Sequence, residues 1–217
     1  MSTTTRENEI YHLEEGHLCV DFVNTAYIQV DEAAPFGYIP TEERLVDLPA
    51  LGVWGLEIGL FRQSDVDILN QPPATGSALR LTELQNLREA LRQIIRAHHS
   101  DQPVPETSMA VVNQTVAPFL ASTRLVPFDH GFRTAMSLEH ATTADQLLDY
   151  TFWAIGQSTI NLLTDHRELE MIVDCPADDC GYLFRDTSHG RRRWCSMKSC
   201  GNRAKVQRFR ERQKISA

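Results

Sequence analysis

Residues 175–200 read CPADDCGYLFRDTSHGRRRWCSMKSC. The stretch holds two cysteine pairs, Cys175 with Cys180 and Cys195 with Cys200, and fourteen residues separate the pairs. A structural zinc site takes four thiolate or imidazole ligands in a tetrahedron. Two short paired turns supply all four ligands when the segment between them folds back as a hairpin. The spacing therefore predicts a four-cysteine zinc finger that binds one Zn2+ per chain.

Other interpretations of the four thiols are open at this stage. The chain has five cysteines, of which only Cys19 lies outside the stretch, and an odd count without a secretion signal argues against a disulfide framework. Four thiols placed by chance, an iron–sulfur cluster, and replacement of one ligand by His189 are the alternatives, although the spacing fits neither ferredoxin pattern. A module this small cannot build a core, so bound metal would contribute most of its folding free energy.

The residues around the cysteines predict a hairpin followed by a helix. Residues 182–186 and 191–194 suit the two strands, with 188–190 at the tip. The run that follows the last cysteine is compatible with a helix and rich in arginine and lysine. Val206 and Phe209, three residues apart, are expected to anchor this helix against the hairpin.

Charge is divided unevenly along the chain. The 217 residues carry a formal net charge of −8, which alone would argue against a nucleic-acid partner. From Arg185 to Ala217, however, eleven basic residues stand against two acidic ones, a net charge of +9, and residues 1–184 carry −17. Such asymmetry indicates contact with a nucleic acid or another acidic surface at one end. The residues predicted to bind nucleic acid are Arg191, Arg192, Arg193, Lys198, Arg203, Lys205, Arg208, Arg210 and Arg212.

This basic segment can act on nucleic acid through its charge. Cations held on a rigid, metal-nucleated unit bind phosphates by charge-assisted contacts and counterion release. The alternatives are a solvated basic tail, or a tail that docks on the protein's own acidic domain. Asn202 and Gln207 are candidate readers of adenine, because a side-chain amide can bond bidentately to that base.

Composition and pattern divide the chain into two units. It is 42% hydrophobic and 23% charged, and it is long enough to bury a core without disulfides. Residues 1–170 are predicted to form an α+β, mostly helical domain with a small antiparallel β-hairpin. Residues 171–217 are predicted to form the four-cysteine finger with its hairpin and basic helix.

Helical periodicity dominates the larger unit. It is strongest over 78–99, where apolar residues recur at steps of three and four. Further helices are predicted over 106–117 and 143–169, and Ile160 in the latter is expected to face the core. Between them, alternation of apolar and polar residues predicts a β-hairpin over 125–138.

The N-terminal part carries weaker signals. Residues 17–23 are apolar and β-prone, which favours a short buried strand that turns into a helix at Asn24. Residues 31–40 contain two prolines and a glycine and are expected to be an exposed loop, after which Thr41 opens a helix. A second helix is expected to begin near Pro49. Its side chains expected in the core are Leu51, Trp54, Leu56 and Ile58.

Two motifs resemble a known bacterial family. The four cysteines, ending in Cys200-Gly-Asn-Arg203, resemble the CGNR zinc finger, which is named for those last four residues. The run LCVDFVNT over 18–25, with Glu43 and Trp54 downstream, resembles the ABATE domain that accompanies this finger. The resemblance covers nearly the whole chain. It implies a stress-responsive transcription regulator in which the cysteines hold zinc and the basic residues meet DNA.

Polar residues within the apolar run near the N-terminus are candidates for a ligand pocket. Asp21 and Asn24, together with Trp54, could line a small-molecule site that makes the domain a sensor. The plainer alternative, which we favour, is that Asp21 and Asn24 bond backbone groups at a turn. Cys19 is expected to be a small buried hydrophobe, because apolar surroundings disfavour the thiolate.

These patterns predict a non-enzymatic regulator. The sequence contains no nucleophile elbow, zinc-protease helix, phosphate loop or dinucleotide fingerprint. We expect the finger to bind double-stranded DNA, and the N-terminal domain to sense a small-molecule effector or to mediate assembly, for example as a homodimer. The alternatives are a zinc-dependent protein- or RNA-interaction module and an enzyme with a pocket in the N-terminal domain. Without a membrane-length apolar stretch or signal peptide, the protein is expected to be cytoplasmic, with no membrane partner.

Overall fold

The computed structural model describes residues 16–31, 33, 38–72, 76–100, 102–136, 141–177 and 180–215 of the chain. Within these residues helices dominate, accompanied by three two-stranded antiparallel sheets. The elements are α1 (Leu18–Val23), β1 (Ala26–Val30), β2 (Tyr38–Glu43), α2 (Leu48–Glu57), α3 (Gln63–Leu69), α4 (Ser77–His99), α5 (Glu106–Leu120), β3 (Thr123–Phe128), β4 (Gly131–Met136), α6 (Ala144–Thr164), α7 (His166–Met171), β5 (Ile172–Asp174), β6 (Leu183–Arg185), the π-helical turn η1 (Met197–Gly201) and α8 (Asn202–Ile215). None of the helices in this described part is long and apolar enough to cross a membrane.

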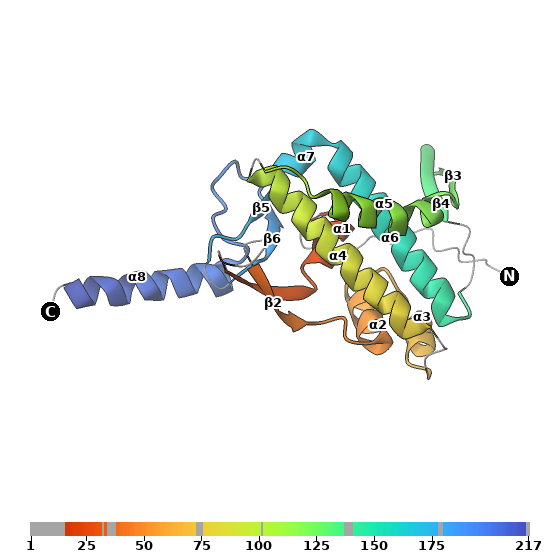
Figure 1. The fold of residues 1–217 in the computed structure, drawn as a ribbon, viewed down its shortest axis with the longest axis horizontal. Coiled ribbons are helices and arrows are strands. Elements are labelled where there is room, and N and C mark those ends of the chain that lie inside the picture. Colours follow the sequence, from red (N-terminus) through yellow and green to blue (C-terminus); the bar gives the residue numbers. More distant parts are fainter. Residues whose placement is uncertain are drawn as a thin grey trace.

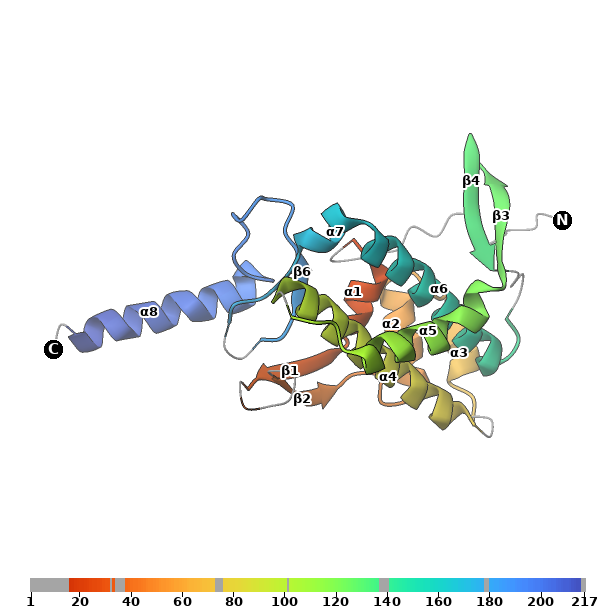
Figure 2. The same cartoon turned by 45° about the horizontal axis from the view of Figure 1, so that its top comes forward.

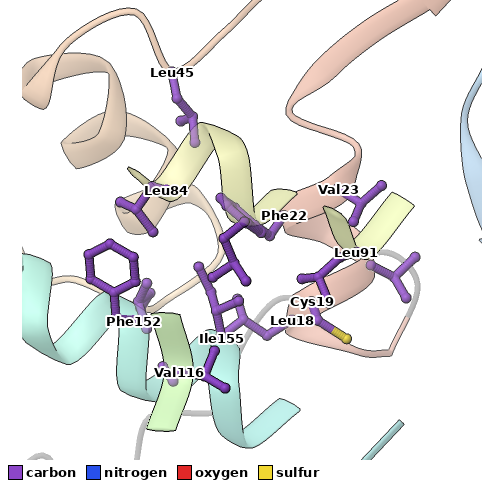
Figure 3. Packing of buried hydrophobic residues seen from close by; sticks show 14 of the residues in the cluster. Leu18, Cys19, Phe22, Val23, Leu45, Leu84, Leu91, Val116, Phe152 and Ile155 are labelled. Carbon is purple, nitrogen blue, oxygen red and sulfur yellow. The ribbon is translucent and has the colours of Figure 1, made fainter. Parts of the chain in front are cut away.

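We call α1–α7 with β1–β4 the body, and the chain from residue 172 onward the finger. In the body, α1 packs against both α4 and α6, and all six of its residues are buried. Figure 3 shows side chains of these three helices, among them Phe22, Leu84 and Phe152, gathered in one core. Phe119 of α5 stacks on Phe152 with ring centroids 4.9 Å apart. The predicted mostly helical α+β architecture is therefore confirmed.

The prediction for the N-terminal part is wrong in four places. Residues 17–23 were expected to be a strand but contain helix α1, because an apolar run buried on every side has no polar face to reveal its period. The helix expected after Asn24 is strand β1. The helix expected from Thr41 is instead the end of β2, which pairs antiparallel with β1. The predicted loop over 31–40 is too long, since β2 begins at Tyr38; residues 32 and 34–37 lie outside the described residues.

The helix predicted near Pro49 is confirmed as α2. Its N-cap is Asp47, whose carboxylate accepts the N–H of Ala50 at 2.8 Å. The prediction that Leu56 lies in the core is wrong, because its side chain is 40% exposed. The others, which are buried, are Leu51, Trp54 and Ile58. Helix α3 was not predicted, although Asp65 in its first turn accepts the N-cap N–H at 3.0 Å.

The strongly periodic segments behave as expected, with one break. The helices predicted over 78–99 and 106–117 are α4 and α5, and the predicted hairpin is β3–β4, beyond which residues 137–140 lie outside the described ones. The single helix predicted over 143–169 is divided, because the Asp165 carboxylate accepts backbone N–H groups at 3.0 and 3.2 Å and so begins α7. Ile160 is 42% exposed, so its predicted place in the core is wrong.

The sheet of the finger is formed by other segments than predicted. β5 pairs with β6, so that Ile172 faces Arg185 and Asp174 faces Leu183. This hairpin encloses the first cysteine pair, whereas residues 191–194, expected to be its second strand, are described but form no strand. The reason is long-range packing: Ile172 and Leu183 are fully buried in the core of the body, which selects these two segments for pairing.

Arg92 of α4 ties the finger to the body. Its side chain is fully buried, and its guanidinium donates to the carbonyl oxygens of Val23, Ala26 and Gly181 at 2.5, 3.1 and 3.0 Å. Burial lowers the pKa of Arg92 to about 10, so the group is still charged at neutral pH. The finger's backbone comes so close here that a Cβ on Gly181 would lie 1.6 Å from a side-chain carbon of Ile28. Glycine is therefore required at this position.

Two further contacts fix β5 and β6 in place. The side-chain amide of Asn24 donates to the carbonyl of Leu183 at 2.8 Å and accepts its N–H at 2.9 Å. Arg96 of α4 forms an ion pair with Asp174 at 2.9 Å. β6 is thus bonded to the residue that directly follows α1, and β5 is bonded to a residue of α4.

A carboxylate in α7 makes the last docking contact. Glu168 accepts two N–H groups of Arg185, each at 2.8 Å, in a bidentate pair. Nε2 of His17 is hydrogen-bonded to the same carboxylate at 2.9 Å. The hydrogen bonds from Arg185 and then from His17 hold the pKa of Glu168 below its usual range. The carboxylate therefore stays ionised and joins the start of α1, α7 and β6.

Replacing Arg92 with leucine is expected to lower the free energy of unfolding by about 3 kcal/mol or more, because three buried carbonyl groups lose their charged donor. Urea denaturation of the zinc-loaded chain, followed by circular dichroism, measures the change. Arg124→Leu on exposed strand β3 is the matched control, expected to stay within about 0.5 kcal/mol of the parent. Equal midpoints for the two variants would contradict the role assigned to Arg92.

Candidate metal centre and basic surface

The four predicted metal ligands come together in the structure. Their Sγ atoms all lie within 4.8 Å of one another. Those of Cys180 and Cys195 are 3.7 Å apart, and those of Cys195 and Cys200 are 3.6 Å apart. Zn–S bonds of about 2.3 Å in a tetrahedron place the sulfurs about 3.8 Å from one another. The cluster therefore has the size and donor set of a zinc site.

Each cysteine is positioned by its own piece of local structure. Cys175 directly follows β5, and its N–H donates to the carbonyl of Tyr182 at 2.9 Å. Cys180 and Cys195 lie in the loops on either side of β6 and the tip, and Cys200 lies in η1. Cys175 and Cys200 are buried, whereas Cys180 and Cys195 are half-buried. The metal site thus lies at the edge of the finger, with two ligands facing inward.

Crowding makes the thiols perturb one another. Hydrogen bonds from Cys180 and Cys195 lower the pKa of Cys175 to about 2. The same bonds to Cys175 raise the pKa of Cys180 to about 12 and that of Cys195 above its usual range. Four thiolates this close repel one another, so a divalent cation is what allows all four to ionise together. The four sulfurs therefore form a donor set for one zinc ion.

The residues after the last cysteine support the site. A Cβ on Gly201 would lie 2.7 Å from the sulfur of Met197, so glycine lets that side chain fold over the start of α8. The amide of Asn202 donates to a carbonyl one turn back at 3.1 Å. Arg203 donates to Sγ of Cys200 at 3.1 Å. Arg203 thus bonds one of the four metal-binding sulfurs, a contact that was not predicted.

Asp186 organises the tip of the finger. Its carboxylate accepts the N–H and the hydroxyl of Ser188 at 2.8 and 2.5 Å and the N–H of Gly190 at 2.6 Å. The bonds from Ser188 hold the pKa of Asp186 below its usual range. His189 lies in this turn with φ of 54° and is exposed. It is not part of the four-cysteine cluster, so its use as a replacement ligand has no support here.

Arg192, predicted to contact nucleic acid, is turned into the finger. Its guanidinium donates to the carbonyl oxygens of Arg185 and Cys195 at 3.0 and 2.6 Å. The same group lies over the ring of Phe184, 4.6 Å from the centroid. Arg192 therefore connects β6 to the loop that carries the third cysteine. A run of three arginines gives no sign of which one points inward, so this role was not predicted.

The other predicted contact residues are exposed. They are Arg191, Arg193, Lys198, Arg203, Lys205, Arg208, Arg210 and Arg212. Figures 1 and 2 show α8 extending away from the body, so the basic helix does not lie on the acidic domain. The prediction that Val206 and Phe209 anchor α8 against the hairpin is wrong, because they are 48% and 62% exposed. The spacing of Val206 and Phe209 places them on one face of the helix, but it does not show which surface that face contacts.

The three candidate pocket residues have different surroundings. The amide of Asn24 is bonded to the backbone of Leu183 in the finger. Trp54 is 6% exposed and belongs to the core of the body, and Asp21 is buried within α1. The structure thus places Asn24 at the docking contact and Trp54 in the core. Cys19 is buried as predicted, and burial raises its pKa to about 12.

Comparison with known protein families agrees with both parts of the chain. Residues 172–213 match the family described as CGNR zinc finger. Residues 16–166 match the ABATE family, described as "Putative stress-induced transcription regulator". A search of curated proteins found no match. The first match covers the four-cysteine cluster, which is consistent with one Zn2+, as predicted from the spacing.

Replacing Cys175 with serine is expected to reduce bound zinc from one per chain to almost none, because a tetrahedral site loses one of four thiolates. Metal analysis of the protein purified without chelator measures this, and circular dichroism should show loss of helix in α8. Cys19→Ala, which removes the thiol outside the cluster, should keep its zinc. A parent chain without zinc, or a serine variant that retains a full equivalent, would refute the assignment.

Replacing Arg192 with alanine is expected to destabilise the zinc-loaded finger by about 1–3 kcal/mol, since two carbonyl groups lose a charged donor and Phe184 loses its covering group. The rate of zinc transfer to a chelator measures this and should rise. Arg193→Ala, at the exposed neighbouring position, is the control and should leave the rate unchanged. Equal rates in the two variants would show that the inward contacts of Arg192 do not stabilise the finger.

Proposed function

This chain belongs to the family in which an ABATE domain, described as "Putative stress-induced transcription regulator", is joined to a CGNR zinc finger, and we propose that it regulates transcription by binding double-stranded DNA through the finger. The observation that supports this proposal is the arrangement of the cations. They are mounted on a metal-held unit whose helix, α8, extends alone from an acidic body.

The charge distribution favours contact at the finger alone. The segment from residue 185 carries +9 and the rest of the chain −17, so phosphates are attracted to one and repelled by the other. A single exposed helix is also the element that the major groove of B-DNA admits. We therefore propose that α8 approaches the groove while the loop before the third cysteine meets the backbone.

The basic residues divide by role in this proposal. Arg191, Arg193, Lys198, Lys205, Arg208, Arg210 and Arg212 bind phosphates. Arg192 and Arg203 act mainly on the finger itself, because their guanidinium groups bond its carbonyls and one of its sulfurs. Phosphate contacts carry no sequence information, so they set affinity and position and not the choice of site.

The N-terminal domain is assigned sensing or assembly. An effector that reached Asn24 would compete with the backbone of Leu183 for its side-chain amide. It would thereby loosen the docking of the finger and alter its presentation of α8. Alternatively, the body joins two chains into a homodimer, which would double the number of base pairs read. We place the protein in the cytoplasm and assign it no catalytic activity.

The proposed function is tested by the salt dependence of DNA binding. The zinc-loaded chain should bind duplex DNA with a logarithmic affinity that falls linearly with the logarithm of salt concentration. Arg193→Ala should reduce the steepness by about 0.9, the loss of one phosphate contact, and Arg124→Ala on strand β3 should not change it.

Two results would contradict the proposal. An affinity for duplex DNA that does not change with salt concentration would show that the chain makes no contacts with phosphates. Equal affinity for single-stranded RNA and duplex DNA would favour the RNA-interaction alternative, and no affinity for either would favour a protein partner.

A further inference from the structure

A cleft lies between the loop after the tip and the first turns of α8. Its volume is about 580 Å³, and residues 191–194 line it together with Pro176, Met197 and residues of α8 up to Arg208. This is the size of a site for a small molecule and not of a surface that receives a whole duplex. A small molecule, or one unit of a larger one, therefore fits it.

The cleft attracts anions. Among the residues that the structure describes, four arginines line it and no acidic residue does. Arg192 is bonded to carbonyls of the finger, and the other three arginines that line the cleft are Arg191, Arg193 and Arg208. Nε of Arg191 donates to the carbonyl of Ser188 at 3.1 Å, and Nε of Arg208 donates to a carbonyl one turn back at 3.2 Å. These bonds position the guanidinium groups, whose other N–H donors suit a phosphate.

The same cleft has an apolar wall. Trp194 is half-buried and Met197 is 54% exposed, and both line the cleft. A Cβ on Gly201 would meet the sulfur of Met197 at 2.7 Å and a ring carbon of Trp194 at 3.3 Å. Glycine at this position therefore lets both side chains pack closely against the start of α8. An indole and a thioether held beside arginines form a surface on which a planar base can stack.

We propose that this cleft binds one phosphorylated nucleoside. Arg191, Arg193 and Arg208 hold the phosphate, and the base lies against Trp194 and Met197. The ligand has two sources with the same chemistry, a free mononucleotide or one nucleotide unstacked from a DNA strand held along α8. The second source rests on the proposed function, whereas the first does not.

Tryptophan fluorescence provides a direct readout. The chain has three tryptophans, and two of them, Trp54 and Trp153, are 6% and 8% exposed in the core of the body. Trp194 is half-buried at the cleft. A ligand that stacks there should quench the emission of Trp194 and leave that of the buried pair unchanged.

The experiment titrates the zinc-loaded chain with thymidine monophosphate, thymidine, inorganic phosphate, a short oligothymidine strand and a fully paired duplex. Fluorescence and calorimetry are recorded together. Thymidine monophosphate is expected to quench and to bind at least about tenfold tighter than thymidine or phosphate, because charge and stacking both contribute. A strand that quenches Trp194, binds more tightly than the mononucleotide and is weakened by Trp194→Ala identifies DNA as the source, whereas a strand that binds less tightly than the mononucleotide identifies a free nucleotide.

Variants separate the two parts of the cleft. Arg193→Ala and Trp194→Ala should each weaken mononucleotide binding about tenfold by calorimetry. Trp194→Phe keeps a ring for stacking, so it should bind but lose the quenching. Arg124→Ala, which removes an exposed charge from β3 at the opposite end of the molecule (Figure 2), should bind like the parent. Zinc content close to one per chain verifies that each variant has folded.

The outcomes distinguish this proposal from the function it extends. Absence of quenching by mononucleotide and strand alike, equal affinities for phosphate and mononucleotide, or quenching that survives Trp194→Phe would each overturn the cleft proposal. Salt-dependent duplex binding that is unchanged in Trp194→Ala would leave the proposed function standing without the cleft. Mononucleotide binding in a chain that binds no DNA would leave the cleft standing without the proposed function.

Discussion

The buried guanidinium of Arg92 is the constraint around which the two parts of this protein meet. It bonds backbone carbonyls of α1, β1 and the finger at once. Burying a charge costs free energy unless the charged group is hydrogen-bonded, so the bonds from Nη1 and Nη2 of Arg92 stabilise the meeting of these three segments at one side chain of α4. Gly181 permits the approach, because any larger residue would overlap Ile28. The near part of the finger is thereby fixed on the body.

This constraint changes what the metal has to do. The finger has a small hydrophobic cluster of its own around Cys175, Phe184 and Cys200, and β5 and β6 also place Ile172 and Leu183 in the core of the body. The near half of the finger is therefore held by packing and by Asn24, Arg96 and Glu168. Zinc is needed for the far half, where the loop after the tip and η1 depend on the cysteine cluster and on Arg192. Loss of metal should free α8 while the strand pair keeps its place.

The features that could be predicted from the sequence depend on local spacing. The four cysteines, the periodic helix α4 and the hairpin β3–β4 can each be recognised from residues that lie close together in the sequence. The failures involve distant partners. The residues of α1 are surrounded by other helices, so their pattern shows burial but not period. The partner of β6 is chosen by the core of the body and not by the turn beside it. Likewise, the inward direction of Arg192 depends on carbonyls that only the folded loop presents.

The length of α8 separates its outer charges from the acidic body. A net charge of −8 describes the average of +9 from residue 185 onward and −17 before it. The fourteen residues of α8 rise about 1.5 Å each, so the helix spans about 21 Å. At physiological salt the Debye length is about 8 Å, so the outer turns are largely screened from the acidic body. The loop and the cleft at the base of α8 lie closer to the body, so its negative charge acts on them more strongly. The negative charge of the body therefore does not weaken the attraction between the outer turns and phosphates. The affinity of the cleft for an anion, in contrast, depends on its arginines outnumbering the acidic residues nearby.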